Sequence, residues 1–595
     1  MKPVRYKTVE MQSYFNNYLK ALTSRVAVKI LLAPVILSAC YVGAESSTGR
    51  DLNSLGLPES SQYAGSSPWG VAPSHTSAWN VSVWKDSIYD LRIANVRGFR
   101  VDQPALAESL NTTGFELTGI LQWSSATSPG SVPSDDLSGW EDYIRATLDT
   151  FPYVTHWEVW NEPPNFTNDK NPASYAAVVA RAYDVIKSVD PGLQVGLAAK
   201  STHLNYMART IESGARDKFD FVTLHPYEVL NLVKSGHDVL YMNIVGEVRK
   251  MLASLNPGKV SVPVRFTEVG IGLDSNLSAD AAQIDQAAAL VKAMTMSIAQ
   301  GVEKVYWFEP LDAEGLKLGL MINGNNPRKA LFAFGNLVRL LGDSPVYLGW
   351  TRPATGVLQH YFRKNDEVIC ISWADSEANF ALESGDVDVK VIDLVTNKSE
   401  GLRGRSIAVG NNPVVAAYPL SNTEIYDRVK TALGNRSKIL LSHDTDFGLV
   451  DEVSISPGVE NGIRILGESR IATANGEQFF DLSRQQALAM VIDPSFFTHF
   501  RENVELVIEL RAKKSASSTP GFNLKVDAYS PAKVAAGENS NSGWNSIAST
   551  EFYQKTWKIE DLTSTGSFGY QLQLDSDSTR FSQYEVKKIS VRRVD

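Results

Sequence analysis

Residues 66–342 are predicted to fold as a (β/α)8 TIM barrel, an α/β fold, followed by a small antiparallel β domain and a C-terminal β-sandwich of jelly-roll type. Three observations lead to this fold class. Short apolar segments alternate with amphipathic helical segments over 66–342, which is typical of parallel α/β folds. The alternation yields eight strand candidates, enough to close a barrel of this length. Beyond residue 343 the apolar spacing changes from 3.6 to 2, which indicates β structure.

The elements of the barrel follow from this spacing. One helix is expected to begin at the cap Asn171-Pro172 and to end at 190–192, and a second to begin near Ser278 and end at Gly301. The strand candidates lie between helical segments, at 68–72, 96–102, 117–123, 156–161, 194–199, 220–225, 263–268 and 303–308.

The rest of the chain divides into two β regions. Residues 343–420 are predicted to form the small β domain, and 421–437 a polar linker with helical character. Residues 438–595 are predicted to form the C-terminal sandwich, because apolar residues alternate with charged ones along its strands. The clearest such run is Val504, Leu506, Ile508 and Leu510.

Composition is that of a folded protein of about three or four domains. The net charge of −9 argues against a nucleic-acid partner, which would require a basic face. No His/Cys/Asp cluster has metal-ligand spacing and no Gly-rich phosphate loop follows a strand, so neither metal nor cofactor is expected. We expect a monomer. Nine of the twelve tryptophans lie at or before Trp350, as sugar-stacking platforms or as an aromatic core.

The N-terminal segment resembles a bacterial lipoprotein signal. An apolar run of about ten residues follows Arg25 and Lys29 and ends in Leu37-Ser38-Ala39-Cys40, similar to a lipobox. Lipidation of Cys40 would anchor the protein in the cell envelope outside the cytoplasm, with 41–65 as a flexible tether. The stretch before Arg25 is long for a signal, so translation starting at Met11, an ordinary secretory signal and an uncleaved anchor stay open.

Two glutamates are placed for paired-carboxylate chemistry. Glu162 lies where the fourth strand runs into Pro163, with Asn161 beside it to bind a sugar hydroxyl, and Glu268 lies at the end of the seventh strand. The C-terminal ends of barrel strands meet at one face, where active sites of this fold lie. Two carboxyl groups about 5 Å apart at such a face are what retaining hydrolysis of a glycosidic bond requires.

The motifs around both glutamates resemble those of the clan A glycoside hydrolases. Trp160-Asn161-Glu162-Pro163 looks like the acid/base motif of the clan, and Thr267-Glu268 looks like its nucleophile strand. Residues 326–330 and the β domain after them look most like glycoside hydrolase family 39, which includes endoglycosidases of biofilm exopolysaccharides. The resemblance covers about 66–420. It implies a retaining glycosidase acting on a polysaccharide or oligosaccharide, with Glu162 as acid/base and Glu268 as nucleophile.

Three further motifs resemble the clan in the same order along the barrel. Gly98-Phe99-Arg100-Val101-Asp102 is similar to its second strand, whose arginine supports the nucleophile. His225-Pro226-Tyr227 is similar to its sixth-strand motif, whose tyrosine hydrogen-bonds the nucleophile. Trp307 is similar to the aromatic floor of its sugar subsite. The resemblance therefore implies that Arg100 and Tyr227 hold Glu268 ionised, while repulsion from Glu268 keeps Glu162 protonated.

Several of these residues have a second interpretation. Glu309, at the end of the eighth strand, is the main rival of Glu268 as nucleophile. Glu158 is expected to be a buried partner of Arg97 or Arg100 rather than a catalyst. His225 is either a core histidine or a support near the nucleophile.

Two further residues are predicted at the walls of the pocket. His75 is expected either to line the pocket or to cap a helix. Trp123, after Gln122, departs from the clan pattern at a subsite wall, so the glycan cannot be inferred by analogy.

Two other functions share these features. A non-catalytic sugar-binding lipoprotein would use the C-terminal sandwich, where Trp544, Tyr553 and Trp557 are either a glycan site or packing residues. A transglycosylase would use the same two glutamates and differ only in the acceptor.

Overall fold

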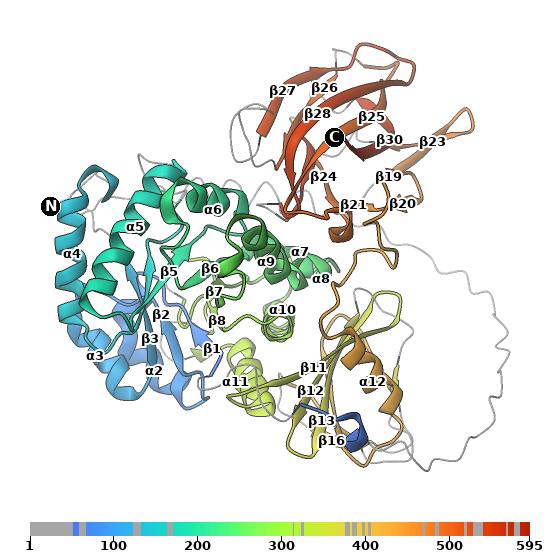
Figure 1. Cartoon of the computed structure of the whole chain (residues 1–595). Coiled ribbons are helices and arrows are strands. Elements are labelled where there is room, and N and C mark those ends of the chain that lie inside the picture. Colours follow the sequence, from blue (N-terminus) through green and yellow to red (C-terminus); the bar gives the residue numbers. More distant parts are fainter. Residues whose placement is uncertain are drawn as a thin grey trace.

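The structure is a computed structural model with three parts, a barrel, a small β domain and a C-terminal pair of sheets (Figure 1). Residues 1–51, including Cys40 and the predicted signal, lie outside the described residues, and so does Trp123. Among the residues that the structure describes, no helix is both long and apolar enough to cross a membrane. The described residues are 52–58, 67–122, 133–163, 171–312, 315–322, 326–374, 381–383, 389–394, 399–402, 406–466, 470–481, 487–516, 520–527, 540–566, 569–575 and 583–594.

Eight parallel strands close into a barrel in the order in which they occur along the chain. β1 pairs with both β2 and β8, which closes the ring. Each strand overlaps one of the eight predicted segments, so the predicted fold class is confirmed. The strands are β1 (Trp69–Val71), β2 (Asn95–Arg97), β3 (Glu116–Leu121), β4 (His156–Val159), β5 (Gln194–Ala198), β6 (Phe221–Leu224), β7 (Val264–Val269) and β8 (Lys304–Trp307).

Ten α-helices of the described residues accompany the barrel, and two of them begin as the sequence predicts. Before α5, the Asn171 side chain accepts a hydrogen bond from the N–H of Ala173, and before α10 the Ser278 hydroxyl accepts one from Ala281. The helices are α2 (Val81–Tyr89), α3 (Pro104–Thr113), α4 (Leu137–Thr150), α5 (Pro172–Val189), α6 (Leu204–Thr210), α7 (Tyr227–Val233), α8 (Asp238–Met242), α9 (Ile244–Leu255), α10 (Ala279–Ala299) and α11 (Lys329–Leu341).

The second strand ends earlier than predicted. The sequence predicts a strand over 96–102, but β2 ends at Arg97 because Gly98 adopts a left-handed conformation, with φ of 80°, that turns the chain. Residues 99–102 therefore lie beyond the strand, at the C-terminal face of the barrel.

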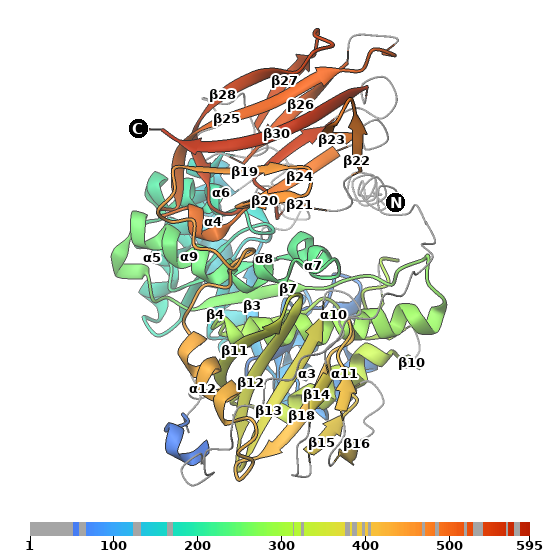
Figure 2. The ribbon, with the colours of Figure 1, turned by 90° about the vertical axis from the view of Figure 1, so that its right-hand side faces the viewer.

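The small β domain is a six-stranded antiparallel sheet with the order β11-β12-β13-β18-β15-β16, beside the two-stranded pair β14-β17. In Figure 2 its strands stand in front of the barrel, next to α10 and α11. The strands are β11 (Val346–Ala354), β12 (Val357–Lys364), β13 (Glu367–Ala374), β14 (Ala381–Glu383), β15 (Val389–Ile392), β16 (Ser399–Leu402), β17 (Ser406–Ala408) and β18 (Val414–Pro419).

Two segments predicted to lie outside this domain belong to its core. Within the predicted linker, helix α12 (Tyr426–Asn435) buries Val429 and Ala432 in that core, so it is not a free connection. Within the predicted tether, the short 3-10 helix η1 (Leu52–Leu55) buries Leu52 completely, and Leu57 is buried beside it. Apolar side chains in an otherwise polar stretch were the signal for both contacts.

Replacing Leu52 with alanine is expected to lower the free energy of unfolding by about 2–4 kcal/mol, because a fully buried leucine leaves a cavity. The change is measured by urea-induced unfolding of the full chain. Leu449→Ala is the control, since Leu449 is 98% exposed and its loss should change stability by under about 0.5 kcal/mol. Equal stability of the two variants would show that 52–57 is not part of the core.

The C-terminal sandwich consists of a seven-stranded and a five-stranded antiparallel sheet that share one hydrophobic core. The alternation predicted in its longest strand is confirmed, because Val504, Leu506, Ile508 and Leu510 are all fully buried. The strands are β19 (Glu452–Ser456), β20 (Val459–Asn461), β21 (Ile463–Leu466), β22 (Ile471–Ala474), β23 (Glu477–Asp481), β24 (Ala487–Ile492), β25 (Arg501–Ala512), β26 (Gly521–Val526), β27 (Ser540–Ser546), β28 (Tyr553–Thr563), β29 (Leu572–Asp575) and β30 (Tyr584–Arg593).

The sandwich rests on the side of the barrel that carries α6 and α9 (Figures 1 and 2). Just after β5, the Thr202 hydroxyl donates a hydrogen bond of 3.0 Å to the carbonyl of Gly566. In α6, the Asn205 amide donates one of 2.8 Å to the buried carboxylate of Asp527. The sandwich is thus tied to a loop at the C-terminal face of the barrel.

Candidate active site

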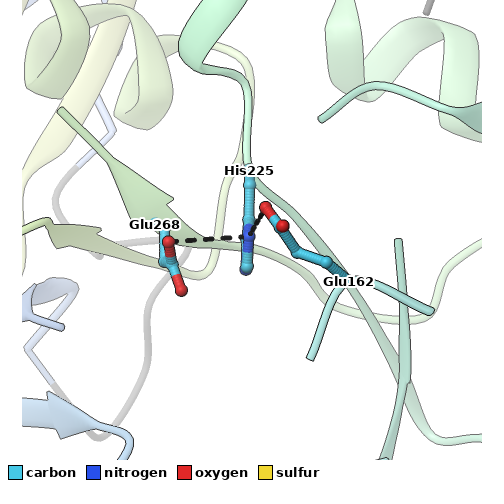
Figure 3. A group of neighbouring side chains, drawn as sticks. All are labelled: Glu162, His225 and Glu268. Carbon is cyan, nitrogen blue, oxygen red and sulfur yellow. Dashed lines mark hydrogen bonds and ion pairs between the residues drawn. The ribbon is translucent and has the colours of Figure 1, made fainter. Parts of the chain in front are cut away.

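Glu162, His225 and Glu268 meet at the C-terminal ends of β4, β6 and β7. Figure 3 shows the imidazole of His225 between the two carboxylates. One carboxylate oxygen from each glutamate and a ring nitrogen of His225 all lie within 4.8 Å of one another. The structure therefore brings together the two glutamates that the sequence singled out, with His225 between them.

The backbone at the end of β4 directs Glu162 into this site. Trp160 and Glu162 both adopt the left-handed conformation, with φ of 67° and 49°. This conformation costs energy for residues other than glycine, and such residues cluster at functional sites. Trp160 itself is 8% exposed and lies near Trp140, at 6.4 Å between ring centroids. Its side chain therefore packs in the barrel core and anchors the backbone that carries Glu162.

Glu268 is held by two donors. Arg97 Nη1 donates to Glu268 Oε1 at 2.5 Å, and the Tyr227 hydroxyl donates to Oε2 at 2.6 Å. Burial and then the charge of Glu268 raise the pKa of Tyr227 well above its usual value, so the phenol keeps its proton and stays a donor. The predicted contact of Tyr227 with Glu268 is present.

Arg97, not Arg100, is the arginine that contacts Glu268. Its Nη1 reaches Glu268, its Nε donates to Glu158 at 2.7 Å, and its Nη2 donates to Asn161 Oδ1 at 2.7 Å. Burial opposes its charge, but Glu158 and Glu268 outweigh that effect and raise the pKa of Arg97. The assignment of Arg100 was wrong because β2 ends at Arg97, the last of its residues that points into the barrel.

Two of the contacts of Arg97 involve other residues that the sequence singled out. Glu158 is fully buried and pairs with Arg97, as expected of a non-catalytic carboxylate. Asn161 accepts from Arg97, so its side chain is oriented by the same arginine that holds Glu268.

His225 connects the two glutamates. Its Nδ1 is 3.0 Å from Glu162 Oε1 and 3.7 Å from Glu268 Oε2, and its Nε2 is 3.1 Å from Thr267 Oγ1. Thr267 and Thr223 contact Glu158, and the Thr223 hydroxyl donates to Glu158 Oε1 at 2.5 Å. His225 therefore supports both glutamates rather than filling the core.

The site holds a proton on the Glu162–His225 pair. Burial opposes the charge of His225, but Glu268 and then Glu162 outweigh it and raise its pKa. Burial would raise the pKa of Glu162, yet the hydrogen bond and charge of His225, followed by Lys200 and Arg97, bring it below its usual value. Both shifts favour an ion pair with the proton on His225, one hydrogen bond from Glu162, whereas the sequence predicts a protonated Glu162.

Replacing His225 with glutamine is expected to move the alkaline limb of kcat/KM to lower pH. In the wild-type chain the pair loses its last proton at the raised pKa of His225, above the usual histidine value. Glutamine cannot hold that proton. The measurement is the pH profile of kcat/KM, with His360→Gln, buried in the small β domain, as control. An unchanged alkaline limb in the His225 variant would contradict the shared proton.

Glu228 is a partly buried acid, close enough to Glu162 to feel its charge, that the sequence analysis missed. It follows Tyr227 directly, and the hydroxyl of Ser201, itself at φ of 48° just after β5, donates to it. Burial raises the pKa of Glu228, and the contact from Ser201 offsets only part of that effect. The signal was present in the sequence, as an acid adjoining the motif tyrosine.

Trp307 does not form the floor of a subsite. It is fully buried, and its indole N–H donates to the carbonyl of Leu318 at 3.0 Å. The next residue, Phe308, is partly exposed and lies edge-on to Tyr227, with ring centroids 6.1 Å apart. Trp307 is therefore part of the core, and the prediction was wrong because side chains of a strand alternate between its two faces.

Two further predicted residues lie away from the site. Glu309 is fully buried and accepts a hydrogen bond of 2.9 Å from the Ser77 hydroxyl. It does not belong to the cluster of Glu162, His225 and Glu268. His75 is exposed and contacts Arg100, so it neither lines the carboxylate site nor caps a helix by a side-chain bond.

Glu162, His225 and Glu268 also form the kind of group that could hold a metal ion. The donor set of two carboxylates and an imidazole suits several divalent cations. However, the guanidinium of Arg97 is bonded to Glu268, and its positive charge opposes a cation there. The same arrangement favours instead a carboxylate pair with one shared proton.

No protein-family model matches the chain, and no curated protein matches it in sequence. Similar solved structures include a conserved exported protein from Bacteroides fragilis, with TM-score 0.46 and 11% identity over 61% of this chain and 99% of that one. A GH51 arabinofuranosidase from Xanthomonas axonopodis pv. citri has TM-score 0.44 and 10% identity over 60% and 97%. A GH39 enzyme from the same organism has TM-score 0.40 and 14% identity over 60% and 96%.

Proposed function

We propose that the protein is a retaining glycoside hydrolase in which Glu268 is the nucleophile and Glu162 the acid/base. The observation that carries the proposal is the separation of the two carboxylates, which approach within 4.8 Å. Retaining glycosidases need about 5–5.5 Å between their carboxyl groups, whereas inverting enzymes need about 6.5–9.5 Å to admit a water molecule.

The two glutamates differ in the way that the two roles require. Glu268 is bound by a guanidinium and a phenol, both of which favour a carboxylate ready to attack. Glu162 is bound by a protonated imidazole and can receive a proton from it. One carboxylate thus has a donor on each of its oxygens, and the other has a proton source.

In the first step, an oxygen of Glu268 bonds to the anomeric carbon as the bond from that carbon to the leaving oxygen breaks. The leaving oxygen takes a proton from Glu162, which draws it from His225 Nδ1 over 3.0 Å. The products are a glycosyl ester of Glu268, a shortened sugar with a new hydroxyl, and a pair that has lost its proton, with Glu162 as carboxylate and His225 as neutral imidazole.

In the second step, Glu162 takes a proton from water and the water oxygen bonds to the anomeric carbon. The ester bond to Glu268 breaks and the carboxylate returns to its contacts with Arg97 and Tyr227. The proton is again on the Glu162–His225 pair, so the site is restored.

The full chain tests this proposal in a screen of soluble polysaccharides scored by new reducing ends. The anomeric configuration of the first product, observed by proton NMR before mutarotation, should be that of the substrate. A product of opposite configuration would refute the retaining mechanism, and a chain that cleaves no glycan while binding one would leave the binding-protein alternative.

A further inference from the structure

The exposure of the tryptophans separates core from surface. The described tryptophans of the barrel are buried, with 8% exposure or less, with the single exception of Trp79 at 45%. In the C-terminal sandwich, Trp557 and Tyr553 pack against the core, and Trp544 is 42% exposed. Two described tryptophans are therefore largely exposed to solvent, Trp79 on the barrel and Trp544 on the C-terminal sandwich.

Trp79 is braced on one face. The guanidinium of Arg100 lies 4.5 Å from the centroid of its ring. That guanidinium is in turn fixed by Asp102, with a hydrogen bond of 2.8 Å from Nε to Oδ1 and an ion pair through Nη2, and by His75. A cation over an exposed ring and a surface ion pair each contribute little to the stability of a fold. The network thus holds the indole in one orientation more than it stabilises the barrel.

The braced ring lies at the catalytic face. Trp79 follows β1 and Arg100 follows β2, so both belong to loops at the C-terminal ends of the strands. Ser77, two residues before Trp79, bonds to Glu309 directly after β8. The C-terminal sandwich contacts Thr202 after β5, on the opposite side of an eight-stranded ring. A glycan crossing this face would pass between Trp79 and the sandwich.

We propose that Trp79 is a stacking platform for an uncharged pyranose of the glycan chain, at a subsite away from the bond that is cleaved. The flat C–H face of a pyranose packs on an indole face that is exposed and rigid. The charge of Arg100 is already neutralised by Asp102, whose side chain is 56% exposed and would accept a sugar hydroxyl but repel a uronate. This subsite rests on the proposed function, because it assumes a glycan at the barrel mouth.

The experiment is affinity electrophoresis of the full chain carrying Glu268→Gln, so that the polymer in the gel is not cut. The probes are hydroxyethylcellulose, galactomannan and arabinoxylan as neutral polymers, and alginate and polygalacturonate as uronates. Trp79→Ala is compared with Trp544→Ala, a tryptophan of nearly equal exposure on the other domain. Thermal unfolding checks that both variants are folded.

We expect at least one neutral polymer to retard the parent chain, and Trp79→Ala to weaken that binding about tenfold. Trp79→Phe should recover part of it, and Trp544→Ala should bind as the parent does. Unchanged binding in Trp79→Ala, loss in Trp544→Ala instead, no retardation by any neutral polymer, or stronger retardation by uronates would each overturn the subsite. Turnover of the unsubstituted chain is scored separately, so failure of the subsite and failure of the proposed reaction are distinguishable.

Discussion

Glu268→Gln is expected to lower kcat by at least about 10⁴-fold while leaving the fold intact. Glutamine keeps the size of the side chain and its one oxygen can still accept from Arg97, while its NH2 group can donate to the Tyr227 hydroxyl, but the neutral amide is a poor nucleophile. The measurement is the rate of reducing-end formation on the polysaccharide that the screen identifies, together with the circular dichroism spectrum. A chain that folds normally and does not turn over is the outcome that the proposed mechanism requires.

Glu309→Gln is the matched control. Glu309 is also buried and also follows a barrel strand, but its oxygen accepts from Ser77 and it stands outside the carboxylate pair. This variant should keep kcat within about threefold, since a glutamine oxygen still accepts that bond. The reverse result, an inactive Glu309 variant and an active Glu268 variant, would transfer the nucleophile to β8.

Arg97→Lys is expected to reduce kcat about 100-fold and to lower the free energy of unfolding by about 2 kcal/mol. Arg97 uses three separate nitrogens for Glu158, Glu268 and Asn161. A lysine ammonium carries the charge at one point and cannot reach all three acceptors, so Glu268 is no longer aimed. Steady-state kinetics and urea-induced unfolding measure the two effects.

Arg265→Lys distinguishes aiming from stability. Arg265 is 2% exposed and bonds to Glu303 at 2.5 Å, but it lies near the start of β7, at the other end of the barrel from Glu268. We expect comparable destabilisation with kcat nearly unchanged. If both variants lost activity in proportion to stability, Arg97 would have only a structural role.

The barrel was predictable because its signal is repeated eight times. Each strand is a short apolar segment between helices, and strand ends at one face place Glu162 and Glu268 together whatever the details of packing. The errors arose where one residue decides the outcome. Gly98 ends β2 early, so the arginine that contacts Glu268 is Arg97 and not the predicted Arg100.

Properties that depend on contacts between distant segments were not predictable. The pKa of Glu162 is decided by His225, 63 residues away, and its direction is opposite to the expectation from Glu268 alone. The exposure of a tryptophan depends on the loops beside it, so the sequence could not separate Trp79 from the buried tryptophans around it.

The docking of Leu52 and Leu57 on the small β domain has a consequence for the order of folding. Leu348 belongs to the same core and follows Leu52 by 348 − 52 = 296 residues, and the whole barrel lies between them. During synthesis the N-terminal residues emerge first. Leu52 and Leu57 therefore cannot be buried until the barrel and then the small β domain have been synthesised. The core of the β domain is therefore completed only when 52–57 meet strands made after the barrel, and a chain shortened to begin at the barrel would leave a gap in that core.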